Sequence, residues 1–141
     1  MPHTSEATTL WSGDLMTGSG TTSLDSSKAA EFPVSWQARA EGVAGMTSPE
    51  ELLGAAHSAC YSMALSNGLA NGGHAPESLQ VTAAVTFQPG EGITGSHLLV
   101  SAKVPGITEE EFEKFAEDAK LNCPVSKALT GIPITLEASL A

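Results

Sequence analysis

The chain has 141 residues, enough for one domain that buries roughly two-thirds of its unfolded surface. Its 16 acidic and 6 basic residues give a formal net charge of -10, which would repel nucleic acids and anionic lipid surfaces. We therefore expect neither a nucleic-acid partner nor a membrane partner. The chain shows no charged-then-apolar leader and no apolar stretch of roughly 20 residues, so we expect a soluble cytoplasmic protein.

The first third of the chain predicts short strands after a polar tail. Residues 1–7 are polar and are expected to be disordered. Strand-like segments follow at 8–13, 18–24 and 32–37, separated by Gly, Ser and Asp in the spacing of an antiparallel meander. A loop is expected over residues 40–47.

The clearest helix signals follow this loop. Ser48 is placed as N-cap, Pro49 at the first helical position and Glu51 three residues after the serine, which completes a capping box. Residues 71–73, Asn-Gly-Gly, supply the left-handed residue of a helix end. Almost every side of this helix is apolar or small, which indicates a helix that is covered on all faces.

The second half predicts a hairpin followed by an amphipathic helix. Residues 79–88 and 97–104 are strand-like, with a Gly-rich turn over 89–95 between them. Thr108 and Glu111 then form a second capping box, with apolar residues on one side of the helix and acidic residues on the other.

A short helix over 124–129 and a strand over 132–140 complete the expected elements. No internal repeat or low-complexity linker interrupts the chain. The order of elements indicates one α+β domain over residues 1–141, with a segregated antiparallel sheet.

The only two cysteines, Cys60 and Cys123, lie on or beside predicted helices. Two cysteines are too few for the disulfide framework of small secreted domains, so a transient catalytic disulfide in a reducing compartment is the better explanation. Cys123 lies at a helix start, where the helix dipole lowers a thiol pKa, whereas apolar neighbours would raise the pKa of Cys60. Two inert, buried thiols are the alternative.

Both cysteine segments resemble those of the OsmC/Ohr family of organic hydroperoxide reductases. Residues 48–66, SPEELLGAAHSACYSMALS, are similar to the first cysteine motif of the family, and residues 122–129, NCPVSKAL, to the second. Residues 38–42 and 134–136 also fall where the family has similar residues. The HSAC and NCPVS forms look more like the osmotically inducible protein C branch than the organic hydroperoxide resistance branch.

The resemblance implies an antiparallel sheet wrapped around central helices in an intertwined homodimer. It implies a cysteine-based peroxidase that reduces organic hydroperoxides in oxidative stress defence, and it leaves the preference between organic hydroperoxides and hydrogen peroxide open. In this cycle Cys60 attacks the peroxide and becomes a sulfenic acid, and Cys123 resolves it as a disulfide. An external dithiol must reopen the disulfide, and the sequence leaves lipoyl-type dithiols, thioredoxin and mycothiol-like thiols open as the reductant. No cofactor and no metal are expected.

Arg39 and Glu50 complete the catalytic set that the resemblance implies. The Arg39 guanidinium stays charged, lowers the pKa of a neighbouring thiol and can donate a hydrogen bond to a peroxide oxygen. Glu50 is the acid that holds Arg39. The adjacent Glu51 is the alternative, although its place in the capping box directs it back at the Ser48 amide.

The spacing of Glu50 and Cys60 has a geometric consequence. Ten residues on one helix separate them by roughly 15 Å, so they cannot meet within one chain. Two copies of this helix packed antiparallel about a two-fold axis would bring them level, with Ala55 at the midpoint. Because Gly54, Ala55 and Ala56 are small, two backbones can approach there. The geometry predicts a homodimer whose active sites draw on both chains.

Two other functions stay open at this stage: a non-catalytic protein that binds a small hydrophobic ligand, and a thiol redox sensor that signals through a partner. His57, one turn before Cys60, could serve a Cys-His hydrolase only with an orienting third group and an oxyanion site, for which nothing argues. His3, His74 and His97 show no metal-ligand spacing.

Overall fold

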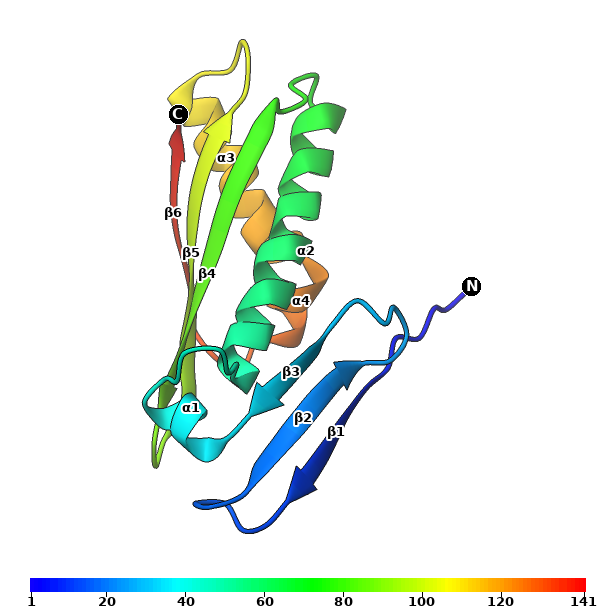
Figure 1. Cartoon of the computed structure of the whole chain (residues 1–141). Helices are drawn as coiled ribbons and strands as arrows, with labels where there is room; N and C mark the ends of the chain where they lie inside the picture. Colours follow the sequence, from blue (N-terminus) through cyan, green and yellow to red (C-terminus); the bar gives the residue numbers. More distant parts are fainter. The chain divides into compact units, whose positions relative to one another are not determined.

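The computed structural model describes residues 1–141 and divides the chain into two compact units, residues 1–49 and residues 50–141. We call them the N-terminal unit and the C-terminal unit. The sequence predicts one domain over the same span. Figure 1 labels the helices and strands of both units.

A three-stranded antiparallel meander forms most of the N-terminal unit, as the turn residues predict. Its strands, in spatial order, are β1 (Ala7–Ser12), β2 (Ser19–Leu24) and β3 (Glu31–Val34). Thr9 and Thr22 are opposite each other in β1 and β2, with their Oγ1 atoms 2.7 Å apart. Ala7, placed at the end of the expected tail, pairs with Leu24 in this sheet.

A short helix, α1 (Trp36–Ala40), lies where the sequence predicts the end of a strand and the start of a loop. Ser35 is its N-cap, because the Ser35 Oγ accepts a hydrogen bond from the backbone N of Ala38 at 3.1 Å. The expected strand over 32–37 therefore ends early, at Val34. Arg39 lies in the last turn of this helix.

The long helix of the C-terminal unit, α2 (Pro49–Asn71), begins and ends where its sequence signals predict. Gly73 has a φ of 87°, and the backbone N of His74 donates to the carbonyl of Leu69 at 2.8 Å. This is the left-handed helix end that the Asn-Gly-Gly sequence favours. Neither this helix nor any other has the length and apolarity that a membrane crossing requires.

The two sides of α2 differ in burial rather than in polarity. The inner side carries the buried residues Gly54, His57, Tyr61, Leu65 and Leu69. The outer side is exposed, although its side chains are small or apolar; it consists of Ala55, Ala56, Ala59 and Met63. Within one chain, the helix is thus covered on one side only, which differs from the expectation of cover on all faces.

A mixed sheet supports the helices of the C-terminal unit. Its strands, in spatial order, are β4 (Ser78–Gln88), β5 (Gly92–Lys103) and β6 (Ile134–Leu140). The β4–β5 hairpin is antiparallel as predicted, but β6 pairs parallel to β5. The chain between these two strands forms two helices and crosses back to the same end of the sheet, as parallel pairing requires. The α+β class is confirmed, while the expectation of a wholly antiparallel sheet is wrong for β6.

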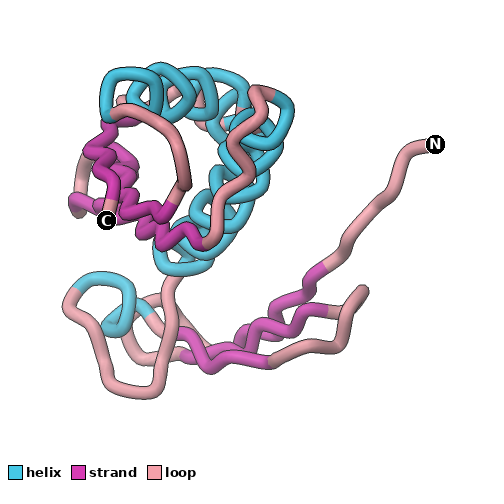
Figure 2. Tube along the Cα trace, turned by 90° about the horizontal axis from the view of Figure 1, so that it is seen from above, coloured by secondary structure: helices cyan, strands magenta, loops and turns pink.

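The two remaining helices are α3 (Glu109–Asn122) and α4 (Pro124–Ala128). Thr108 caps α3 as predicted, because its Oγ1 accepts from the backbone N of Glu111 at 3.1 Å. In the C-terminal unit, α2 and α3 lie on one face of the sheet (Figures 1 and 2). The core between them contains Tyr61, Leu65, Leu69, Leu98, Val100, Ala102, Phe112 and Ala119.

Candidate active site

The two cysteines lie together in the C-terminal unit. Cys60 is in the middle of α2, while Cys123 ends α3 and precedes α4. Their thiols are near enough to shift each other's pKa, and both are free. Cys60 is partly exposed, whereas Cys123 is fully buried. The fold thus brings together two thiols that are remote in the sequence.

The two thiols have opposite pKa shifts. Burial raises the pKa of Cys60, and the hydrogen bond with Cys123 raises it further. Burial also acts to raise the pKa of Cys123, but donors outweigh it: the Cys60 thiol, the backbone N–H groups of Ser126 and Val125, and the Ser126 hydroxyl. The pKa of Cys123 is therefore lowered. Burial and the neighbouring Cys123 thiol both disfavour a thiolate at Cys60, which a nearby cation would favour.

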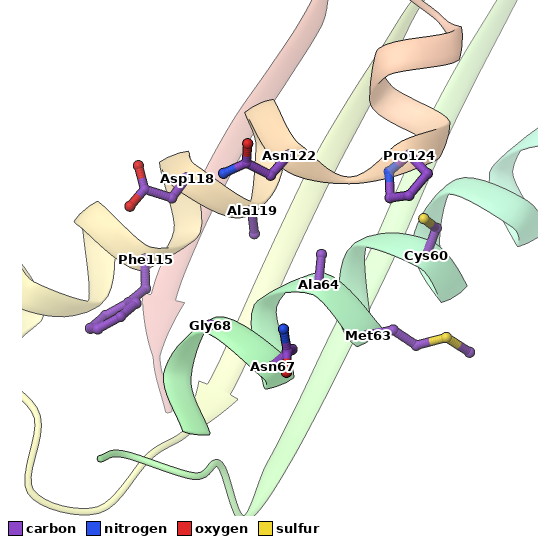
Figure 3. Close-up of a pocket in the computed structure, with 10 residues that line it drawn as sticks. All are labelled: Cys60, Met63, Ala64, Asn67, Gly68, Phe115, Asp118, Ala119, Asn122 and Pro124. Carbon is purple, nitrogen blue, oxygen red and sulfur yellow. The ribbon is translucent and has the colours of Figure 1, made fainter. Parts of the chain in front are cut away.

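An apolar cavity of about 580 Å³ opens beside Cys60. Figure 3 shows that its walls come from α2, α3 and the start of α4. The lining residues are Cys60, Met63, Ala64, Asn67, Gly68, Phe115, Asp118, Ala119, Asn122 and Pro124. Cys123 is absent from this lining, so a molecule in the cavity meets the Cys60 sulfur first.

Gly72, just after the end of α2, makes room for the aromatic wall of this cavity. A Cβ atom on Gly72 would lie 2.5 Å from the Phe115 ring, so the ring occupies the space that a side chain at position 72 would need. A Cβ on Gly68 would lie 3.9 Å from the same ring, an ordinary van der Waals contact. The Phe115 position therefore depends on glycine at 72 but tolerates alanine at 68.

His57 belongs to a buried polar cluster that the sequence analysis did not identify. Its Nδ1 lies 2.7 Å from the Ser96 Oγ on β5, and its Nε2 lies 2.8 Å from the Ser126 Oγ on α4. All three side chains are buried. Because Ser126 follows Cys123 by only three residues, the sequence could have indicated that Ser126 lies near this thiol. Nothing local in the sequence connects Ser96 to the cluster. With both ring nitrogens bonded to serines, His57 is not placed as a base for Cys60.

Arg39 and Glu50 lie in different units. Arg39 is half-buried in α1 of the N-terminal unit, and Glu50 lies in the first turn of α2, 6% exposed. Glu51 is exposed. Because α2 is unbroken from Pro49 to Asn71, Glu50 and Cys60 of one chain stay about 15 Å apart. No group of three or more His, Cys, Asp or Glu side chains is arranged to hold a metal.

Comparison with known proteins identifies the family. Residues 42–137 match the family described as OsmC-like protein, which is more than half of the chain. The chain belongs to the OsmC-like protein family. The OsmC/Ohr resemblance of its sequence motifs is thereby confirmed, and the match spans Glu50, Cys60 and Cys123 but begins after Arg39.

Relatives of this OsmC-like chain carry names of both branches. It is 42% identical over 133 residues to Peroxiredoxin OsmC of Escherichia coli (strain K12), covering 92% of each chain. It is 34% identical over 104 residues to Organic hydroperoxide resistance protein OhrA of Bacillus subtilis (strain 168), covering 72% of this chain and 73% of that protein. The crystal structure of an OsmC like protein from Mycoplasma pneumoniae has the same fold, with a TM-score of 0.72, 19% identity and coverage of 100% and 99%.

Proposed function

We propose that this chain is a thiol peroxidase that reduces organic hydroperoxides in oxidative stress defence. The observation that carries the proposal is the proximity of the Cys60 thiol, on a cavity wall, to the buried Cys123 thiol. The names of the two relatives, a peroxiredoxin and an organic hydroperoxide resistance protein, support the same chemistry. A cycle that alternates between thiols and a disulfide suits the reducing cytoplasm.

The sulfur chemistry of the proposed cycle is carried by the two thiols and an external dithiol. The Cys60 thiolate attacks one peroxide oxygen, the O–O bond breaks, and the alkoxide takes a proton and leaves as an alcohol. Cys123 then attacks the Cys60 sulfenic acid, which forms the disulfide and releases water. An external dithiol, lipoyl-type or thioredoxin-like, reduces the disulfide by exchange and restores both thiols. Cys60 has the first role because it alone of the two lines the cavity.

The cavity favours an organic peroxide over hydrogen peroxide. Met63, Ala64, Phe115 and Pro124 give it apolar walls, and its volume exceeds what a molecule as small as hydrogen peroxide requires. An alkyl or aryl group would displace water from these walls and gain hydrophobic free energy. We therefore expect a higher kcat/KM for an aryl hydroperoxide than for hydrogen peroxide.

Arg39 is proposed as the cation that activates Cys60. Burial raises the pKa of Cys60, so the thiolate needs compensation, and Arg39 is the one arginine of the sequence. Glu50, buried at the start of α2, is proposed to hold it. Arg39→Ala should slow peroxide reduction, with about tenfold less thiolate for each unit by which the Cys60 pKa rises. Arg39→Lys serves as the control that keeps the charge; an unchanged rate in the alanine variant would remove Arg39 from the site.

A homodimer through the outer side of α2 is part of the proposal. That side is exposed in the single chain and consists of small or apolar residues, among them Ala55, Ala59 and the 72%-exposed Met63. Gly54 does not belong to it, because a Cβ there would lie 2.8 Å from the carbonyl oxygen of Ala83 on β4. The small residues that permit close helix approach are thus the alanines alone. An antiparallel pair centred on Ala55 would bring Glu50 level with the partner's Cys60.

Replacement of each cysteine tests the assigned roles. Cys60→Ser should abolish turnover of an aryl hydroperoxide with a dithiol reductant, because no sulfenic acid forms. Cys123→Ser should still consume one equivalent of peroxide, but without the internal disulfide. Steady-state peroxide consumption, single-turnover peroxide titration and mass spectrometry of the oxidised thiols measure these outcomes. Equal activity in both variants and the parent would refute the roles, and unchanged free thiols after peroxide would favour a ligand-binding role for the cavity.

A further inference from the structure

The buried cluster of Ser96, His57 and Ser126 lies directly behind the second thiol. Its members come from three elements, β5, α2 and α4, and each is at most 4% exposed. The two hydrogen bonds of the His57 ring measure 2.7 and 2.8 Å. Ser126 follows Cys123 by three residues in α4, and its hydroxyl interacts with the Cys123 thiol and lowers the pKa of that thiol. The cluster therefore extends from β5 to the surroundings of the Cys123 thiol.

We propose that Ser96, His57 and Ser126 form a proton relay that accepts the proton of Cys123 as this thiol attacks oxidised Cys60. The inference rests on the proposed peroxidase cycle, in which Cys123 resolves the sulfenic acid. His57 and Ser126 act through Cys123 and touch no substrate, so they are positioning residues. The relay assigns a task to the one fully buried histidine of the chain.

The hydrogen-bond pattern of a neutral imidazole determines how the relay can run. Neutral histidine has one N–H and one lone pair, so one serine accepts from the ring and the other donates to it. With the Cys123 thiol protonated, the S–H donates to the Ser126 Oγ, the Ser126 O–H donates to Nε2, and Nδ1–H donates to the Ser96 Oγ. Every polar atom is then bonded, in accord with the absence of unsatisfied buried side-chain N or O atoms.

Proton transfer along this chain creates the nucleophile. The Cys123 proton moves to the Ser126 Oγ while the hydroxyl proton of Ser126 moves to Nε2, which leaves an imidazolium whose Nδ1–H still donates to Ser96. The thiolate attacks the Cys60 sulfur, the S–S bond forms and the S–O bond breaks. The leaving hydroxide takes one proton and becomes water, and His57 returns to its neutral form. Cys123 sulfur is oxidised, the sulfenic sulfur is reduced, and no other reactant is needed.

The electrostatic surroundings favour a neutral resting histidine. Burial lowers the pKa of His57, and no charged group contributes to this shift. From α2, Cys60 and Tyr61 interact electrostatically with Cys123, and from α3, Glu117 interacts with Tyr61. Lys127 of α4 is exposed, and on the sheet the His97 Nε2 and Glu137 Oε1 atoms lie 3.7 Å apart.

Three variants separate the relay from general packing. Ser126→Ala removes the link between His57 and Cys123, Ser96→Ala removes the partner of Nδ1, and His57→Gln keeps hydrogen bonding but cannot take up a proton. Ser101→Ala is the matched control, since this serine lies on the same strand as Ser96 but is exposed. Circular dichroism shows which variants fold; Ser126→Ala removes a single oxygen atom and is expected to fold in every case.

The rate of disulfide formation after one equivalent of aryl hydroperoxide is the decisive measurement. Quenched samples, alkylated and analysed by mass spectrometry, separate sulfenic acid formation at Cys60 from disulfide formation. We expect Ser126→Ala and His57→Gln to form the disulfide about 100-fold more slowly near neutral pH, with the sulfenic acid step unchanged. Their rates should rise by about tenfold per pH unit below the thiol pKa, unlike the flatter profile of the parent. If the variants form the disulfide as fast as the parent, or more slowly but with the pH profile of the parent, the relay is overturned.

A second measurement does not depend on peroxidase activity. In a Cys60→Ser background, Cys123 is the single thiol, and its ultraviolet thiolate absorbance reports its pKa directly. Ser126→Ala should raise this pKa, because it removes a donor to the thiolate, whereas Ser101→Ala should not. An unchanged pKa would overturn the relay even if the enzyme is a peroxidase. A raised pKa in a protein that consumes no peroxide would support the relay geometry and refute the proposed function.

Discussion

The inner and outer sides of α2 use the same kinds of residue for different purposes. On the inner side, Gly54 lets the helix approach the carbonyl oxygen of Ala83, and further along the helix Tyr61, Leu65 and Leu69 pack into the core. On the outer side, Ala55 and Met63 are small or apolar as well, yet they are exposed. An apolar helix surface that stays exposed in a monomer is a common mark of an interaction site.

The comparison also separates two chemical environments on one helix. His57 is on the inner side and is fully buried, with both ring nitrogens bonded. Cys60, less than one turn later, is partly exposed at a cavity. One helix therefore carries a thiol that lines the cavity and a buried histidine on its inner side, and its two sides can be altered separately.

The largest expected effect comes from a charge on the outer side. In the proposed dimer, Ala55→Glu would place two carboxylates together at the two-fold axis, where burial and like charge oppose association. We expect a monomer by light scattering and loss of peroxide turnover, while the free energy of unfolding of the single chain changes by less than about 0.5 kcal/mol. Ala70→Glu is the control, because it adds the same charge beyond the overlap of two antiparallel helices. A stable, active dimer carrying Ala55→Glu would show that the outer side has another role.

The same substitution at two glycines of α2 should have opposite effects on stability. Gly54→Ala would place a Cβ 2.8 Å from the Ala83 carbonyl oxygen, and we expect a loss of about 1–3 kcal/mol. Gly68→Ala meets nothing closer than Phe115 at 3.9 Å, so the better helix propensity of alanine should contribute about 0.5–1 kcal/mol. Chemical denaturation of the two variants measures both. Equal losses of stability in the two variants would mean that the close approach of α2 to β4 does not distinguish position 54 from position 68.

The smallest expected effect is a pH dependence of protein stability, caused by His57 on the inner side of α2. Because burial lowers the pKa of His57 in the folded protein, the unfolded chain binds an additional proton as the pH falls below about 6.5. The free energy of unfolding should therefore decrease from neutral pH through this range. The free energy of unfolding of the His57→Gln variant should decrease less over the same interval, as measured by denaturant titrations at several pH values. Parallel curves for the parent and the variant would contradict a neutral buried His57.

Local signals predicted the bounds of the helices well. Ser48, Pro49 and the glycines after Asn71 act within a few residues, so α2 begins and ends as predicted. The Thr108 capping box did the same for α3. The five-residue helix α1 was missed because a single turn shows no hydrophobic periodicity, and only the capping serine at position 35 marked it.

Non-local features were beyond the sequence patterns. The parallel direction of β6 depends on the path of the chain through α3 and α4, which the alternation within β6 does not encode. The inner and outer sides of α2 were indistinguishable because nearly all positions are apolar or small, so Gly54 was assigned to helix pairing although it faces β4. The motifs singled out Cys60 and Cys123, whereas the link from Ser96 to His57 joins positions 39 residues apart and left no pattern.

The distance along the chain between the two cysteines has a thermodynamic consequence. A covalent link between Cys60 and Cys123 would close a loop of roughly 60 residues, which in a chain-entropy estimate disfavours the unfolded ensemble by about 4 kcal/mol. The oxidised protein would then melt at a higher temperature than the reduced one. Each catalytic turnover would pass through a more heat-resistant state, and a melting curve would report which redox state prevails in a sample.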